Sequence, residues 1–112
     1  MGPTLELSPL VGDAGIKVAG EIDLATARHL TDALASISTN SEVHLELSEL
    51  TFMDSSGLGA IAAFAGSRSA GCPVVLLNPS VGIKRLFEIT CLEQHPTIEV
   101  RAVSKDDLPE ER

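Results

Sequence analysis

Residues 46–65 of the chain read ELSELTFMDSSGLGAIAAFA, and this stretch organises the chain. It predicts a short apolar strand that ends at Asp54-Ser55-Ser56 and leads directly into a helix. Asp54 or Ser55 is expected to be the N-cap of that helix, because its side-chain oxygen can accept a hydrogen bond from a backbone N–H group that lacks a partner within the helix. Small hydroxyl groups are thereby placed at an exposed, electropositive helix start, where we expect chemistry or recognition.

The first turn of the predicted helix contains two glycines, Gly57 and Gly59. Each costs roughly 1 kcal/mol relative to alanine inside a helix, so we expect close approach of another backbone or of a partner surface as the reason for both. The helix also carries no charge from Ser55 to Ser67, and its apolar residues spread around more than one face. It must therefore be covered on more than its sheet side, either by neighbouring helices or by a partner at its first turns.

Three stretches together resemble one known family. Residues 51–59 resemble the signature of the anti-sigma-factor antagonists, which are bacterial members of the STAS domain family. Residues 20–23 with Thr26 are similar to the family's Gly-Glu-Leu-Asp-x-x-Thr segment, and residues 78–80 followed by 84–88 are similar to its late loop-helix segment. The three stretches lie in family order and span most of the chain.

The resemblance implies a function and a set of site residues. In such a family the unphosphorylated antagonist binds an anti-sigma factor with serine-kinase activity and so releases the sigma factor. The first serine after the aspartate, here Ser55, would be phosphorylated to switch binding off, and a serine phosphatase would reverse this. Partner contacts would come from residues on two neighbouring loops: Asp23, Thr26, Asp54, Ser56, Gly57, Leu58 and Gly59. No metal or cofactor is implied.

The expected fold class is α/β, a STAS domain with a small mixed sheet of four to five strands and packed helices. Two strands over 4–7 and 17–22 are expected to pair through a turn near 12–15. Asp23 is placed to cap a helix with apolar residues at helical spacing, and a third strand over 43–47 alternates Val43, Leu45 and Leu47 with polar residues. The intervening helix permits a parallel crossover between these strands.

The second half of the chain predicts a buried strand, a short helix and an edge strand. The apolar run over 74–77 suits an interior strand, and Ser80 is expected to cap the helix that follows. Thr90-Cys91 occupies the position where the family often has a glycine, so the end of that helix is expected to differ or to be strained. Residues 98–100 suggest an edge strand.

Length and composition predict one domain over residues 1–112, with a core of about 4–103 and a short helix or frayed tail over 104–112. We place Leu47 and Ile61 in the core beneath the turn at Asp54. The absence of an apolar stretch of membrane-spanning length and of a signal-like start predicts a cytoplasmic protein. Cys72 and Cys91 are expected to be reduced. A net charge of -8 without Trp or Tyr argues against nucleic-acid binding.

Two alternatives belong to other function classes, an enzyme and a regulatory subunit. Ser55 does not lie in a Gly-x-Ser-x-Gly elbow, and His29, His44 and His95 show no metal-ligand spacing, so we expect no enzyme and treat the histidines as solvated or satisfied structural residues. The second alternative is a STAS regulatory subunit of a lipid or anion transport system or of a sensory complex, which would share the same fold.

Overall fold

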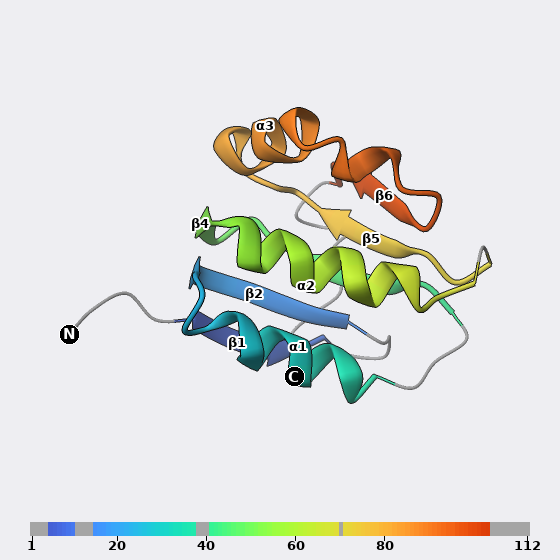
Figure 1. Ribbon diagram of the computed structural model, residues 1–112, viewed down its shortest axis with the longest axis horizontal. Helices are drawn as coiled ribbons and strands as arrows, with labels where there is room; N and C mark the ends of the chain where they lie inside the picture. Colours follow the sequence, from blue (N-terminus) through green and yellow to red (C-terminus); the bar gives the residue numbers. More distant parts are fainter. Residues whose placement is uncertain (1–4, 11–14, 38–40, 70, 104–112) are drawn as a thin grey trace.

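The computed structural model describes residues 5–10, 15–37, 41–69 and 71–103, which form one sheet with its helices (Figure 1). In chain order the elements are β1 (Leu5–Pro9), β2 (Gly15–Ile22), α1 (Ala27–Ala35), β3 (Val43–Glu46), β4 (Leu50–Met53), α2 (Ser55–Gly66), β5 (Val74–Leu77), α3 (Val81–Ile89), the short 3-10 helix η1 (Leu92–Gln94) and β6 (Ile98–Arg101). Thr4, most of the predicted turn near 12–15 and the predicted tail over 104–112 lie outside the described residues.

The sheet is mixed, as expected, and has the strand order β1-β2-β3-β5-β6. β1 runs antiparallel to β2, whereas β2, β3, β5 and β6 run parallel to one another. The parallel pairing of β2 with β3 confirms the parallel crossover through α1. The sheet has six strands instead of four to five, because Leu50–Met53 forms a strand of its own. β4 pairs with β2 from Gly20 onward, beyond Lys17, where pairing with β3 ends.

Gly20 marks the register shift on β2, and its φ is 97°. A side chain rarely tolerates this backbone conformation, so glycine is the residue that permits the irregularity. Thr51 secures the junction, since its hydroxyl donates to the carbonyl of Gly20 at 3.0 Å. The shift lets one long strand pair in succession with two short ones.

The core lies between the sheet and the helices α1 and α2, which run side by side in front of it (Figure 1). Leu47 and Ile61 are both 0% exposed, so their predicted place in the core is confirmed. Complete burial of such a side chain contributes roughly 1.5–3 kcal/mol. α1 packs along one flank of α2, but an outer stripe of that helix, Ser55, Gly59, Ala63 and Gly66, stays exposed.

The predicted strand over 74–77 is confirmed as an interior strand with all four residues buried, and Ser80 caps α3 by accepting from the N–H of Ile83. The helix ends in an unusual way, because Cys91 takes a left-handed φ of 59°. A residue with a Cβ pays roughly 1–2 kcal/mol for this conformation, so the predicted strain is confirmed. Cys72 and Cys91 form no disulfide within the described part of the chain, and the predicted edge strand is β6.

The histidines follow the prediction in two of three cases. His29 is exposed, and Nδ1 of His95 accepts from the N–H of Thr97 at 3.2 Å. Nε2 of His44 lies 2.8 Å from a carboxylate oxygen of Glu42, but its buried Nδ1 has no hydrogen-bond partner among the described residues, so His44 is only half satisfied. Within the described ranges, no helix has the length and apolar character needed to cross a membrane.

Candidate functional site

The turn between β4 and α2 holds two serines in different states. Asp54 is the N-cap of α2, as predicted: its carboxylate accepts from the backbone N–H of Ser56 at 2.9 Å and from the hydroxyl of the same serine. The hydrogen bond from the Ser56 hydroxyl, helped by backbone N–H groups, holds the pKa of Asp54 below its usual value. Asp54 is therefore ionised at neutral pH, and the Ser56 hydroxyl is engaged inside the turn.

Ser55 differs from its neighbour. It is exposed, and within the described part of the chain its hydroxyl has no hydrogen-bond partner. As the first residue of α2 it lies where backbone N–H groups and the helix dipole favour negative charge. The Ser55 hydroxyl is thus the group of this turn that an incoming reagent can reach.

The two glycines of the first turn serve different purposes. A Cβ at Gly57 would lie 2.7 Å from Cγ of Met53 and 2.8 Å from Cγ2 of Ile22, so α2 approaches the sheet too closely there for any side chain. Gly59 has nothing within 4 Å of its would-be Cβ and is exposed. Internal packing therefore requires Gly57 and leaves Gly59 unexplained, which makes Gly59 the better candidate for a partner contact.

Asp23 and Thr26 form a closed turn after β2. The Asp23 carboxylate accepts from the backbone N–H of Thr26 at 3.0 Å and from its hydroxyl at 3.1 Å, while the Thr26 hydroxyl oxygen accepts from the N–H of Asp23 at 2.9 Å. The predicted N-cap role of Asp23 needs correction, because α1 begins at Ala27 and its N-cap is Thr26. Asp23 instead closes the turn that precedes the helix, and Leu24 within that turn is 83% exposed.

Glu46 corrects the predicted alternation of β3. Its side chain was expected on the polar face, yet the residue is only 4% exposed. Its carboxylate accepts from the N–H of Ser48 at 2.6 Å and from the side-chain amide of Asn78 at 3.3 Å. Asn78 has a left-handed φ of 53°, and its Oδ1 accepts from the N–H of Val103. This buried network ties the start of the loop before α3 to β3.

The three loops after β2, β4 and β5 lie at one edge of the sheet, because these strands run in the same direction. All three helices begin at this edge (Figure 1, left). The predicted site residues of the first loop, Asp23 and Thr26, therefore lie at the same edge as those of the second, residues 54–59. Sequence reasoning missed two exposed apolar residues at this edge, Leu24 and Val81, the latter 88% exposed.

The edge has the character of a binding surface. Among the described residues, no histidine is hydrogen-bonded to Ser55 or Ser56, so the turn shows no serine–histidine pair of the kind that activates a nucleophilic hydroxyl. Exposed apolar side chains suit recognition by another protein, and an accessible hydroxyl at a helix start can take a negatively charged modification. A local signal for Leu24 and Val81 existed, since each is an apolar residue directly after a predicted N-cap, Asp23 or Ser80.

A family model and the two relatives named here each match most of this chain. Residues 10–102 match a family described as Mlab, STAS domain. The anti-sigma-B factor antagonist of Listeria monocytogenes is 38% identical over 91 residues, which are 79% of this chain and 78% of that protein. The anti-sigma-B factor antagonist of Staphylococcus epidermidis is 34% identical over 84 residues, which are 70% of this chain and 75% of that protein.

Two solved structures share the fold. An anti-sigma factor antagonist from Mycobacterium paratuberculosis superposes with a TM-score of 0.74 at 24% identity, over 95% of this chain and 90% of that chain. The antagonist SpoIIAA in its unphosphorylated form gives a TM-score of 0.66 at 20% identity, over 95% of this chain and 91% of that chain.

Proposed function

This chain belongs to the STAS domain family, and we propose that it is an anti-sigma factor antagonist whose binding is switched at Ser55. In its unphosphorylated form it binds an anti-sigma factor and thereby releases a sigma factor. The observation that carries the proposal is the contrast between the exposed, unengaged hydroxyl of Ser55 and the hydroxyl of Ser56, which is held by Asp54. Only one of the two serines is ready to accept a phosphoryl group.

The binding surface we propose is the edge where the three helices begin. Leu58 and Gly59 would lie against the partner, and Gly57 would allow the start of α2 to pack closely against the sheet. Asp23 and Thr26 would contribute by holding their turn in shape, which presents Leu24. The surface is thus apolar around Ser55, with the carboxylate of Asp54 beside it.

A phosphate on Ser55 would add a charge of about -1.5 to -2 at neutral pH. The fold should tolerate it, because Ser55 is exposed and the start of α2 favours an anion, although the ionised Asp54 opposes it. The complex should not tolerate it, because the charge would be desolvated against an apolar partner surface. A buried charge without a partner costs roughly 3–5 kcal/mol, which corresponds to a loss of about two to four orders of magnitude in affinity.

The wider assignment follows from this switch. The partner would be an anti-sigma factor with serine-kinase activity that uses ATP, a serine phosphatase would restore the free hydroxyl, and the protein would act in the cytoplasm. The chain itself would not be an enzyme, since neither serine is paired with a histidine in the described part of the chain. The relatives reported above are named antagonists, so a regulatory subunit of a transport system or sensory complex is not favoured.

Isothermal titration of a candidate anti-sigma factor from the source organism tests the proposal. Ser55→Ala should bind as wild type does, and Ser55→Asp should stay folded but lose about two orders of magnitude in affinity or more. Ser67→Asp is the matched control, because it places the same charge on an exposed serine at the other end of α2 and should bind normally. Equal affinity for wild type and Ser55→Asp would contradict a charge switch at Ser55.

Phosphorylation itself needs a separate measurement. The candidate kinase and ATP are incubated with wild type, with Ser55→Ala and with Ser56→Ala, and the phosphate is located by mass spectrometry. Wild type and Ser56→Ala should be modified on Ser55, whereas Ser55→Ala should stay unmodified. A phosphate on Ser56, Thr26 or Ser67 would show that the site is wrongly assigned.

A further inference from the structure

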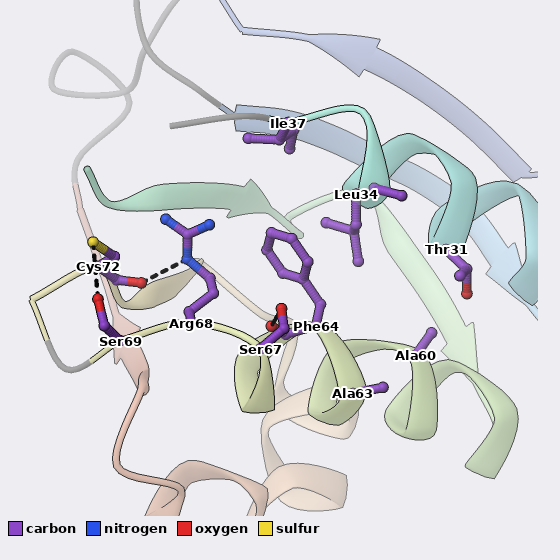
Figure 2. A pocket seen from close by; sticks show the side chains of 11 residues that line it. Thr31, Leu34, Ile37, Ala60, Ala63, Phe64, Ser67, Arg68, Ser69 and Cys72 are labelled. Atoms are coloured by element: carbon purple, nitrogen blue, oxygen red, sulfur yellow. Dashed lines mark hydrogen bonds between the residues drawn. The ribbon is translucent and has the colours of Figure 1, made fainter. Parts of the chain in front are cut away.

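A pocket of about 580 Å³ lies between α1 and the second half of α2 (Figure 2). Its volume falls in the range of small-molecule sites in proteins, about 300–1,000 Å³. Ser67 and Arg68, which follow α2, help to line it, whereas Ser55 lies at the other end of the same helix. A helix of 12 residues is about 18 Å long, so the pocket is separate from the edge that carries Ser55.

One part of the pocket is apolar. Leu34 and Ile37, at and beyond the end of α1, face the ring of Phe64 on α2 (Figure 2). Ala60 and Ala63 line the same wall of α2, and their short side chains leave room beside that ring. The hollow therefore exists because alanines occupy positions where larger side chains would fill the space between the two helices.

The other part of the pocket is polar and held in a fixed geometry. The guanidinium of Arg68 lies over the Phe64 ring at 5.2 Å from its centre, and it donates to the carbonyls of Cys72 and Ser41, both at 2.6 Å. The hydroxyl of Ser69 donates to the sulfur of Cys72 at 3.5 Å (Figure 2). Because a thiol sulfur is a weak acceptor, this hydroxyl can turn toward a stronger one.

The charge of the pocket sets it apart from the rest of the chain. The protein has 16 acidic residues and a net charge of -8, yet among the described residues that line the pocket none is acidic and one is an arginine. An organic anion in this pocket would therefore meet no carboxylate from the described lining residues. An apolar wall with a cation and a hydroxyl at one end is the usual composition of a site for such a ligand.

We propose that this pocket binds a small organic acid with an apolar body. The carboxylate or sulfonate head would lie beside Arg68 and accept from the hydroxyl of Ser69. The apolar body would lie against Phe64, Leu34 and Ile37, between the two helices.

The probe for the test is 1-anilinonaphthalene-8-sulfonate, an aromatic anion that fluoresces when it enters an apolar site. The chain contains no Trp or Tyr, so the emission of the probe can be followed without interference from the protein. We expect saturable binding with one probe per chain. The uncharged N-phenyl-1-naphthylamine has the same aromatic body, and it should bind about tenfold more weakly or worse because it lacks the charge-assisted contact.

Variants locate the binding. Ala63→Phe fills the pocket from an exposed helix position and should weaken binding of the probe at least about tenfold. Ala102→Phe places the same ring on an exposed residue outside the pocket and should bind as wild type does. Arg68→Lys should retain most of the affinity and Arg68→Gln should lose about tenfold, with circular dichroism confirming that both remain folded.

Three results would overturn the proposal. The first is a failure of the probe to saturate at one site, and the second is equal affinity for the charged and uncharged compounds. The third is normal binding to Ala63→Phe together with loss of binding in Leu24→Ser, which would place the probe at the exposed apolar edge. None of these measurements requires the anti-sigma partner, so their outcome is independent of the proposed switch.

Discussion

Replacing Gly57 by alanine should destabilise the protein, whereas the same change at Gly59, in the same helical turn, should stabilise it. A Cβ on residue 57 would lie 2.7 Å from Cγ of Met53 and 2.8 Å from Cγ2 of Ile22. The Met53 side chain can shift, but Ile22 is 0% exposed and its Cβ, which is bound to the backbone, lies only 3.3 Å away. Relief of the overlap therefore requires α2 to move away from the sheet.

The magnitudes follow from these contacts. Overpacking of this kind costs about 1–3 kcal/mol, and alanine recovers about 1 kcal/mol in helix propensity. The rigid Ile22 places the overpacking cost toward the upper end of that range. After the gain in helix propensity, the free energy of unfolding of Gly57→Ala should be about 1–2 kcal/mol lower than that of wild type. Gly59→Ala meets nothing within 4 Å and should gain close to the full 1 kcal/mol or so of helix propensity.

Urea unfolding of wild type and the two variants, followed by far-UV circular dichroism, measures the difference. Fluorescence is unsuitable because the chain has no Trp or Tyr. The two variants should differ by about 2–3 kcal/mol in free energy of unfolding, with similar dependences on urea. Equal stabilisation of both variants would refute the claim that α2 touches the sheet at Gly57. If the stabilised Gly59→Ala also binds the partner more weakly, Gly59 contributes to the partner interface.

Truncation of Leu47 or Ile61 to alanine should cost about 2–5 kcal/mol, because both are 0% exposed, and a loss below about half a kcal/mol in the urea titration would contradict their burial. Cys91→Gly should stabilise the protein by about 1 kcal/mol, since glycine adopts the left-handed φ of 59° without strain; an unchanged or lower melting temperature would speak against this. The hydrogen bond from Arg101 lowers the pKa of Glu42 from its ordinary value of 4.5. The ionised pair therefore stabilises the fold at pH values above the unfolded-state pKa. This contribution is lost as the pH falls through the lowered folded-state pKa. Arg101→Met should therefore make the free energy of unfolding less dependent on pH below about 4.5. The effect should be small, because the pair is partly exposed. If the stability of both proteins falls identically with pH, the pair contributes nothing.

Local patterns in the sequence were sufficient wherever the cause is local. The N-caps Asp54 and Ser80 act on backbone groups within three residues, so their side-chain chemistry and their place before an apolar run identify them. The unbroken apolar run over 74–77 identifies an interior strand for the same reason. The strained helix end at Thr90-Cys91 was instead implied by the family resemblance, because the family often has a glycine where a left-handed residue is needed.

Other features depend on which distant segments meet. β4 became a separate strand because β2 is long enough to pair with both β3 and β4, with Gly20 absorbing the shift in register. Glu46 alternates with apolar residues as an exposed side chain would, yet it is buried because Asn78, 32 residues later, donates to it. Spacing within one strand carries no information about such a contact.

The sequence by itself determined the order and type of the main elements, the apolar residues of the core and the serine pair at the start of α2. Their periodicity and capping residues act within a few positions of the chain. Only the tertiary structure decided which of Ser55 and Ser56 is accessible, which of Gly57 and Gly59 is required by packing, and where a pocket remains between α1 and α2. These properties depend on atoms that lie close in space, and the neighbours that determine them, such as Ile22 beneath Gly57, are brought there by the fold.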